Sequence, residues 1–64
     1  MTALESFVLE YLKEHTAGVK PIEIMHKAMD KNSMWDQRDV SNAFWALQQA
    51  GKTRTEYGSL FLVE

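Results

Sequence analysis

The amino-acid sequence predicts a small α+β domain in which three helices precede a C-terminal β-hairpin, with a short strand after the first helix. Apolar residues recur at helical spacing in three segments, and a capping pattern or a proline begins each of them. The residues around Gly58 alternate as two antiparallel strands do. A chain of 64 residues has room for one domain, residues 1–64, with one small core.

The first helix is expected to follow Thr2, whose hydroxyl can accept from the Glu5 amide while the Glu5 carboxylate accepts from the Thr2 amide. Gly18, after Ala17, is expected to end it, because glycine readily takes a left-handed conformation. Leu9 lies off the main apolar stripe, either as a dimer contact or as an ordinary exposed leucine. The stripe consists of Leu4, Phe7, Val8, Tyr11 and Leu12.

The second helix is expected to begin at Pro21, whose missing amide hydrogen would have no partner in a first turn. Val19 and Lys20 are too few for an independent strand but could pair with the hairpin. The expected apolar stripe consists of Ile22, Met25, Ala28 and Met29, with Ile24 beside it. Another face carries Lys20, Lys27 and Lys31.

The third helix has the strongest predicted start. Asp36 is placed as its N-cap and Asp39 at the third helical position, while Trp35 and Val40 are spaced as a hydrophobic staple. Gly51 is expected to close it. Its predicted buried stripe consists of Val40, Ala43, Phe44, Leu47 and Ala50.

Residues 52–55 and 59–63 are predicted to form the two strands of the hairpin. Leu60 and Leu62 alternate there with Phe61 and Val63. Gly58 permits a positive φ in the connection, as short hairpin turns require.

Over its whole length the chain resembles a winged helix-turn-helix domain. The resemblance is strongest over residues 40–52, where Val-x-x-Ala-Phe-Trp-x-Leu-x-x-x-Gly-Lys is similar to the third helix of many such domains. It implies three helices with a hairpin wing, and a third helix that usually enters a DNA groove.

The spacing is also similar to that of the Z-DNA-binding domains of RNA-editing deaminases, in which an aromatic residue follows a buried apolar one as Trp45 follows Phe44. Ser41 stands where that subfamily has its key asparagine, and Asn42 where it has arginine or lysine. Its paired prolines are missing near residues 59–60. The resemblance therefore implies the broad winged-helix class and not Z-DNA binding.

The exposed side of the third helix, from about Asp36 to Ala50, is predicted to read the DNA major groove, with the wing on the backbone. Asparagine and glutamine can bind adenine there, and arginine can bind guanine. The predicted nucleic-acid-binding residues are Gln37, Arg38, Ser41, Asn42, Trp45, Gln48, Gln49, Lys52, Arg54 and Tyr57. Candidates for contacts to the DNA backbone are Lys20, Lys27 and Lys31.

The function expected from this arrangement is that of a small DNA-binding transcriptional regulator. Its partner would be double-stranded DNA, and a homodimer is expected because a monomer with so few basic residues has little affinity.

The formal net charge of −2 has the wrong sign for an ordinary DNA-binding protein. Asp36 and Asp39 at the leading end of the third helix would also repel phosphates. The alternative is a winged-helix protein-interaction module, an adaptor or an inhibitor of a nucleic-acid machine, that uses Trp45 and the same helix face. Trp45 either contacts a partner or packs under the wing against Phe61 or Tyr57, and the sequence leaves both open.

Enzymatic activity is not expected, and neither is a cofactor or a metal site. The sequence has no cysteine, and His15 and His26 lack partners at the spacing of a catalytic or metal-binding motif. It also has no apolar run of the roughly 20 residues needed to span a membrane, and no basic segment typical of a signal peptide. These features predict an intracellular, cytoplasmic protein that does not associate with a membrane.

Overall fold

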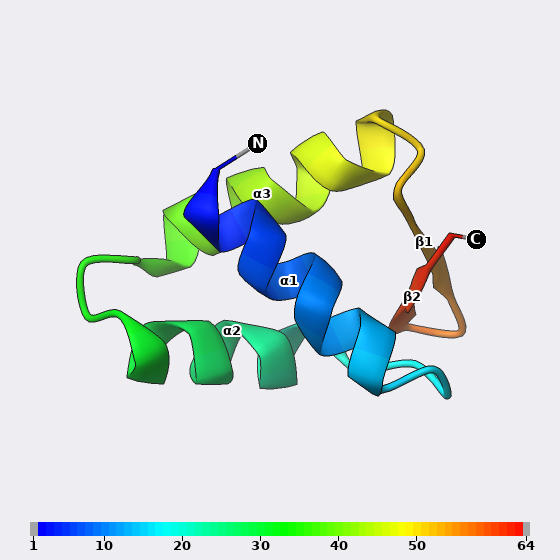
Figure 1. Ribbon diagram of the computed structural model, residues 1–64, viewed down its shortest axis with the longest axis horizontal. Helices are drawn as coiled ribbons and strands as arrows, with labels where there is room; N and C mark the ends of the chain where they lie inside the picture. The colour runs from blue at the N-terminus through cyan, green and yellow to red at the C-terminus, as the bar shows by residue number, and fades with distance from the viewer. Residues whose placement is uncertain (1, 64) are drawn as a thin grey trace.

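Three helices and one antiparallel hairpin make up the chain, whose computed structural model describes residues 2–63. The helices are α1 (Ala3–Glu14), α2 (Pro21–Lys31) and α3 (Gln37–Gln49), and the strands are β1 (Thr53–Glu56) and β2 (Ser59–Leu62). In Figure 1, α1 crosses in front of α2 and α3, and the hairpin closes one end of this helical layer. This confirms the predicted α+β layout, which is consistent with a small winged helix.

The capping box predicted at Thr2 is present, and the predicted N-cap Asp36 forms a second capping box with Asp39. The Glu5 amide donates to Thr2 Oγ1 at 3.1 Å, and the Thr2 amide donates to Glu5 Oε1 at 2.8 Å. At the start of α3, the Asp39 amide donates to Asp36 Oδ1 at 2.9 Å and the Asp36 amide donates to Asp39 Oδ2 at 3.2 Å. Pro21 begins α2, as predicted. These caps give amide groups at the start of α1 and α3 the partners that the helix itself cannot supply.

The core lies where the three helices meet the hairpin. Its largest fully buried side chains are those of Leu12, Ile24, Val8 and Val40. Leu9, expected as a dimer contact or an exposed leucine, is half-buried and packs against this core. Ala50, expected to be buried, is exposed just beyond the end of α3.

The predicted stripe of α2 is partly wrong. Ile24 and Ala28 are fully buried, whereas the side chain of Ile22 is 54% exposed and that of Met29 is 39% exposed. Because successive helical residues are about 100° apart, Ile22 lies about 200° around the helix from Ile24 and cannot share its face. Met25 is half-buried and packs against the edge of the core.

The hairpin is tight, with Glu56 opposite Ser59 and a two-residue turn between them. Tyr57 (φ 52°) and Gly58 (φ 77°) both have positive φ, as a type I′ turn requires. β1 has the predicted length but is shifted by one residue, because it covers Thr53–Glu56, and β2 ends one residue earlier than predicted, at Leu62.

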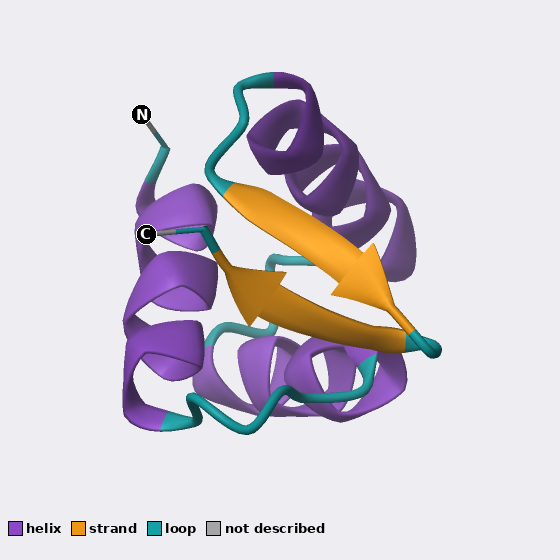
Figure 2. Cartoon of the chain, turned by 90° about the vertical axis from the view of Figure 1, so that its right-hand side faces the viewer, coloured by secondary structure: helices purple, strands orange, loops and turns teal. Residues whose placement is uncertain are grey.

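The expected short strand after α1 is a single bridge. The Val19 amide donates to the Leu60 carbonyl at 3.0 Å, and the Leu60 amide donates to the Val19 carbonyl at 2.7 Å. Figure 2 shows the hairpin lying across the end of the helical layer, with its turn on the side opposite α1, the helix next to the N label. No helix within residues 2–63 is long and apolar enough to cross a membrane.

Candidate nucleic-acid interface

The outward surface of α3 carries the predicted recognition residues. Val40, Ala43 and Leu47 are buried, which turns the opposite side of the helix to solvent. The side chains exposed on α3 are those of Gln37, Arg38, Asp39, Ser41, Asn42, Trp45, Gln48 and Gln49. All seven predicted α3 residues are therefore accessible to a partner.

Trp45 lies outside the core, with 66% of its side chain exposed. The alternative that it packs under the wing against Phe61 or Tyr57 is wrong. Trp45 is two positions from both Ala43 and Leu47, about 200° around the helix from each, so it points away from the residues that face the core.

α3 presents two different flanks. Asp39, Ala43 and Ala46 border the start of α1, because they line one cleft with Thr2 and Leu4. Gln37, Ser41 and Gln48 lie on the opposite flank by helical geometry, and Trp45 lies next to them. This flank turns away from α1, to the same side as the hairpin turn (Figures 1 and 2).

The distal face is the name used here for the surface on the side away from α1. Helical geometry turns the exposed α2 and α3 members of this face away from α1, and Tyr57 belongs to it through the hairpin turn; the members are Ile22, Met29, Gln37, Ser41, Trp45, Gln48 and Tyr57. Tyr57, at the tip of the hairpin, is fully exposed at 103%. Polar groups that can form hydrogen bonds thus share this face with two exposed aromatic rings.

Arg54 and Lys52 flank this surface at the hairpin. The Arg54 side chain is held on two sides: its Nε lies 3.1 Å from Glu56 Oε1, and its guanidinium carbon lies 4.8 Å from the centroid of the Phe61 ring. Lys52 is exposed in the connection between α3 and β1. Because Glu56 offsets part of the Arg54 charge, the wing adds little net positive charge.

The three lysines of the α2 segment do not join the distal face. Lys31 Nζ lies 5.9 Å from the centroid of the Phe7 ring of α1. Lys20, Lys27 and Lys31 fall along one line of α2 by helical geometry, so all three lie on the flank toward α1. Helical geometry thus turns Lys27 and Lys31 away from the distal face, whereas Lys20 directly follows Val19, which pairs with Leu60 of the hairpin.

The acidic residues are concentrated toward α1. Glu5, Glu10 and Glu14 belong to α1 itself. Glu23 of α2 accepts a hydrogen bond from the Tyr11 hydroxyl of α1 at 3.1 Å. Burial and the Glu23 carboxylate raise the pKa of Tyr11 above 10.0. From Val40 to Gln49, α3 carries no carboxylate, so the formal charge of −2 does not describe its outward surface.

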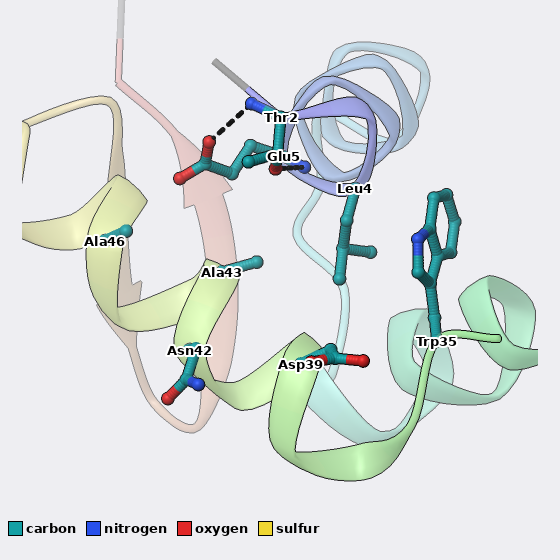
Figure 3. A pocket seen from close by; sticks show the side chains of 8 residues that line it. All are labelled: Thr2, Leu4, Glu5, Trp35, Asp39, Asn42, Ala43 and Ala46. Atoms are coloured by element: carbon teal, nitrogen blue, oxygen red, sulfur yellow. Dashed lines mark hydrogen bonds between the residues drawn. The ribbon is translucent and has the colours of Figure 1, made fainter.

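A second feature, which the sequence did not reveal, is a cleft of about 470 Å³ between the start of α1 and α3. Figure 3 shows the Leu4 side chain between the two helices, with the Trp35 indole on one side of it and the Glu5 side chain on the other. The residues that line it are Thr2, Leu4, Glu5, Trp35, Asp39, Asn42, Ala43 and Ala46. It depends on how α1 crosses α3, which residue spacing within one helix cannot predict.

His15 is held against Tyr11 at the end of α1. His15 Nδ1 lies 2.8 Å from the Tyr11 carbonyl oxygen, and the His15 ring stacks on the Tyr11 ring at a centroid distance of 4.3 Å. Within residues 2–63, no group of three or more metal-ligating side chains is placed to hold a metal ion.

Comparison with known proteins gives no relative: no family model, no curated protein and no solved structure matches this chain. The function must therefore be inferred from the chain's own surfaces.

Proposed function

We propose that this protein is a small winged-helix transcriptional regulator that binds double-stranded DNA, with α3 in the major groove and the hairpin on the backbone. The observation that carries the proposal is the exposed surface of α3. Trp45 is 66% exposed in the middle of a surface of amide, hydroxyl and guanidinium side chains. A tryptophan this exposed does not stabilise the core, and stacking or packing on a partner would use it.

The side chains on α3 have the chemistry that base reading requires. Asn42, Gln48 and Gln49 each offer an amide that can bind adenine with two hydrogen bonds, and Arg38 can bind guanine in the same way. Tyr57 at the tip of the hairpin would reach the neighbouring sugar–phosphate chain, on the same side of the molecule as Trp45.

Electrostatics would contribute modestly to this binding. Arg38, Lys52 and Arg54 lie on or near the proposed interface, and Glu56 offsets part of Arg54. Contacts to about three phosphates predict a salt slope of about −3 in a plot of log affinity against log salt. A homodimer on two half-sites would double this term, which is why the proposal includes self-association on DNA. It also includes the cytoplasmic location expected from the sequence.

The test is a titration of the isotope-labelled protein with a pool of mixed-sequence DNA duplexes at low salt, followed by backbone amide and indole NMR signals. The signals of residues 37–49 and 52–58 should move together, and the Trp45 indole signal should move the most. Raising the salt should then weaken binding with the slope given above. Unmoved signals in these segments, in a protein that stays folded, would overturn the proposal.

A protein-interaction module is the second candidate, and the exposed apolar residues of α2 favour it. Ile22 (54% exposed) and Met29 (39%) lie on the distal face with Trp45. DNA offers little to an isoleucine or methionine beyond the thymine methyl group, whereas a protein partner can bury both. This candidate would be an adaptor or an inhibitor of a nucleic-acid machine. If no DNA duplex moves the NMR signals of the distal face, the protein-interaction module is favoured over DNA binding.

A further inference from the structure

The cleft between the start of α1 and α3 has the chemistry of a site for a cationic side chain. Its floor is hydrocarbon, from Leu4, Ala43 and Ala46, and the Trp35 indole forms one wall (Figure 3). Two acidic side chains, Glu5 and Asp39, lie on its border. Among the described residues that line it, none is basic.

Both carboxylates are held in place and retain an oxygen for a further donor. Glu5 uses Oε1 for the Thr2 amide, and Asp39 uses Oδ2 for the Asp36 amide. Each second oxygen can accept from a partner. The hydrogen bond from the Thr2 backbone amide is the main cause that lowers the pKa of Glu5 below 4.5, so this carboxylate is ionised at neutral pH.

We infer that this cleft binds an arginine side chain from an exposed basic segment of a partner protein. Arginine matches three features at once: its methylene stem suits the hydrocarbon floor, its planar guanidinium stacks on an indole, and its five donors can reach a carboxylate. The positive guanidinium complements the negative charges of Glu5 and Asp39. Trp35 and the apolar floor give the cleft a shape that fits the side chain, which the two capping carboxylates alone would not provide.

The inferred site lies on the α1 side of α3 and is separate from the distal face. Asn42 is the only residue shared between the lining of the cleft and the predicted DNA contacts. A chain with both surfaces could hold DNA on one side and a basic protein segment on the other. The inference does not rest on the proposed function, because it uses neither Trp45 nor the hairpin.

The test uses the intact labelled protein and a capped tripeptide, Gly-Arg-Gly, with Gly-citrulline-Gly as the uncharged probe. The arginine peptide should move the Trp35 indole signal and the amide signals of Leu4, Asp39 and Ala46, but not the Trp45 indole signal. A single side chain in an open cleft should bind with a dissociation constant on the order of 1 mM. The citrulline peptide should bind much more weakly.

Two amide variants isolate the charge. Glu5→Gln and Asp39→Asn each keep an acceptor oxygen for the helix cap and remove the carboxylate charge. Each should weaken binding of the arginine peptide by about threefold to fivefold, as for a partly exposed ion pair. Glu10→Gln is the matched control, because it removes the same charge from α1 outside the cleft and should leave binding within about twofold.

Three results would overturn the inference: unmoved Trp35 and Leu4 signals, equal binding of the arginine and citrulline peptides, or equal weakening by Glu5→Gln and Glu10→Gln. Melting curves of the variants show whether each stays folded. Failure here would leave the DNA proposal standing, since the Trp45 indole and the amides of residues 52–58, which report duplex binding, lie outside the cleft.

Discussion

Gly18 and Phe61 approach so closely that a β-carbon at position 18 would clash with the Phe61 ring unless the ring moved. A β-carbon built on Gly18 would lie 2.6 Å from Cζ of the Phe61 ring, and Gly18 has a φ of +98°. The turn between α1 and α2 therefore passes directly against the outer side of β2. Val19, the next residue, pairs with Leu60 of the same strand. This contact fixes the wing against the helices and so sets where the hairpin turn points.

Replacing this glycine should destabilise the fold severely. Gly18→Ala combines a left-handed backbone with a steric clash, and the two together should cost about 3 kcal/mol. Domains of this size rarely have more than about 3–5 kcal/mol of stability, so much of the variant should be unfolded at room temperature. Circular dichroism during urea denaturation measures the change.

Gly51→Ala is the matched control for the backbone contribution. Gly51 also has a positive φ, of +74°, but a β-carbon there would meet nothing within 4 Å. Its cost should be only about 1 kcal/mol. The Phe61→Leu background tests the clash itself: Gly18→Ala should be less harmful there than in the native chain. Equal effects in both backgrounds would show that the ring is not responsible.

Acid should weaken the α1 cap through Glu5. Its pKa lies below 4.5 in the folded chain, mainly because the carboxylate accepts the Thr2 backbone amide, so folding favours the ionised form. This contribution to stability is present above 4.5 and is lost as the pH falls through the lower folded value. Thermal melts of the native chain and Glu5→Gln should therefore converge as the pH is lowered, because glutamine does not titrate. A constant difference between the two melting temperatures at every pH would contradict this.

Buried Thr53 should tolerate loss of its hydroxyl. The residue is 4% exposed, and within the described chain Oγ1 has no hydrogen-bond partner. Thr53→Val keeps the β-branched shape that suits a strand and removes the unpaired polar atom. The free energy of unfolding should stay equal or rise by about 1 kcal/mol. A marked fall in the free energy of unfolding, measured by urea denaturation, would mean that the Thr53 hydroxyl has a hydrogen-bond partner in solution.

Local signals predicted the parts of the fold that depend on neighbours in sequence. The capping boxes at Thr2 and Asp36 need only residues three positions apart, and the Tyr57-Gly58 turn needs only one glycine in a short connection. The orientation of α2 was harder, because its apolar residues are spread over most of the helix. Packing against α1 and α3 selected Ile24 and Ala28 and left Ile22 outside.

The candidate site also combines features that the sequence predicts with features that depend on how the helices pack. The exposure of Gln37, Arg38 and Ser41 follows from the buried stripe of α3 alone. Two other properties depend on how the helices cross: the position of Lys31 beside Phe7, and the cleft beside Trp35. No spacing within one helix carries that information, so sequence reasoning grouped the α2 lysines with α3 and missed the cleft.

Tyr57 is expected to lower the stability of the fold while contributing to DNA binding. It has a φ of 52° and is fully exposed, in a turn position that asparagine, aspartate or glycine occupies with less strain. Tyr57→Asn should raise the free energy of unfolding by about 1 kcal/mol. If the hairpin contacts DNA as proposed, the same change should weaken duplex binding several-fold. Increased stability with unchanged duplex affinity would remove Tyr57 from the interface.

Trp45→Ala should separate binding from folding most sharply. The side chain is 66% exposed and points away from the core, so its removal should change the free energy of unfolding by less than about 1 kcal/mol. Leu47, two residues along the same helix, is 2% exposed, and Leu47→Ala should cost about 2–5 kcal/mol. Trp45→Ala should nevertheless lose most of the duplex affinity, because an aromatic side chain at the centre of an interface commonly carries a large share of its energy. Fluorescence anisotropy with a labelled duplex measures the affinity, and urea denaturation measures the stability. A large loss of stability in Trp45→Ala would place the indole in a packing role, whereas unchanged affinity in a folded variant would move the interface away from the outward surface of α3.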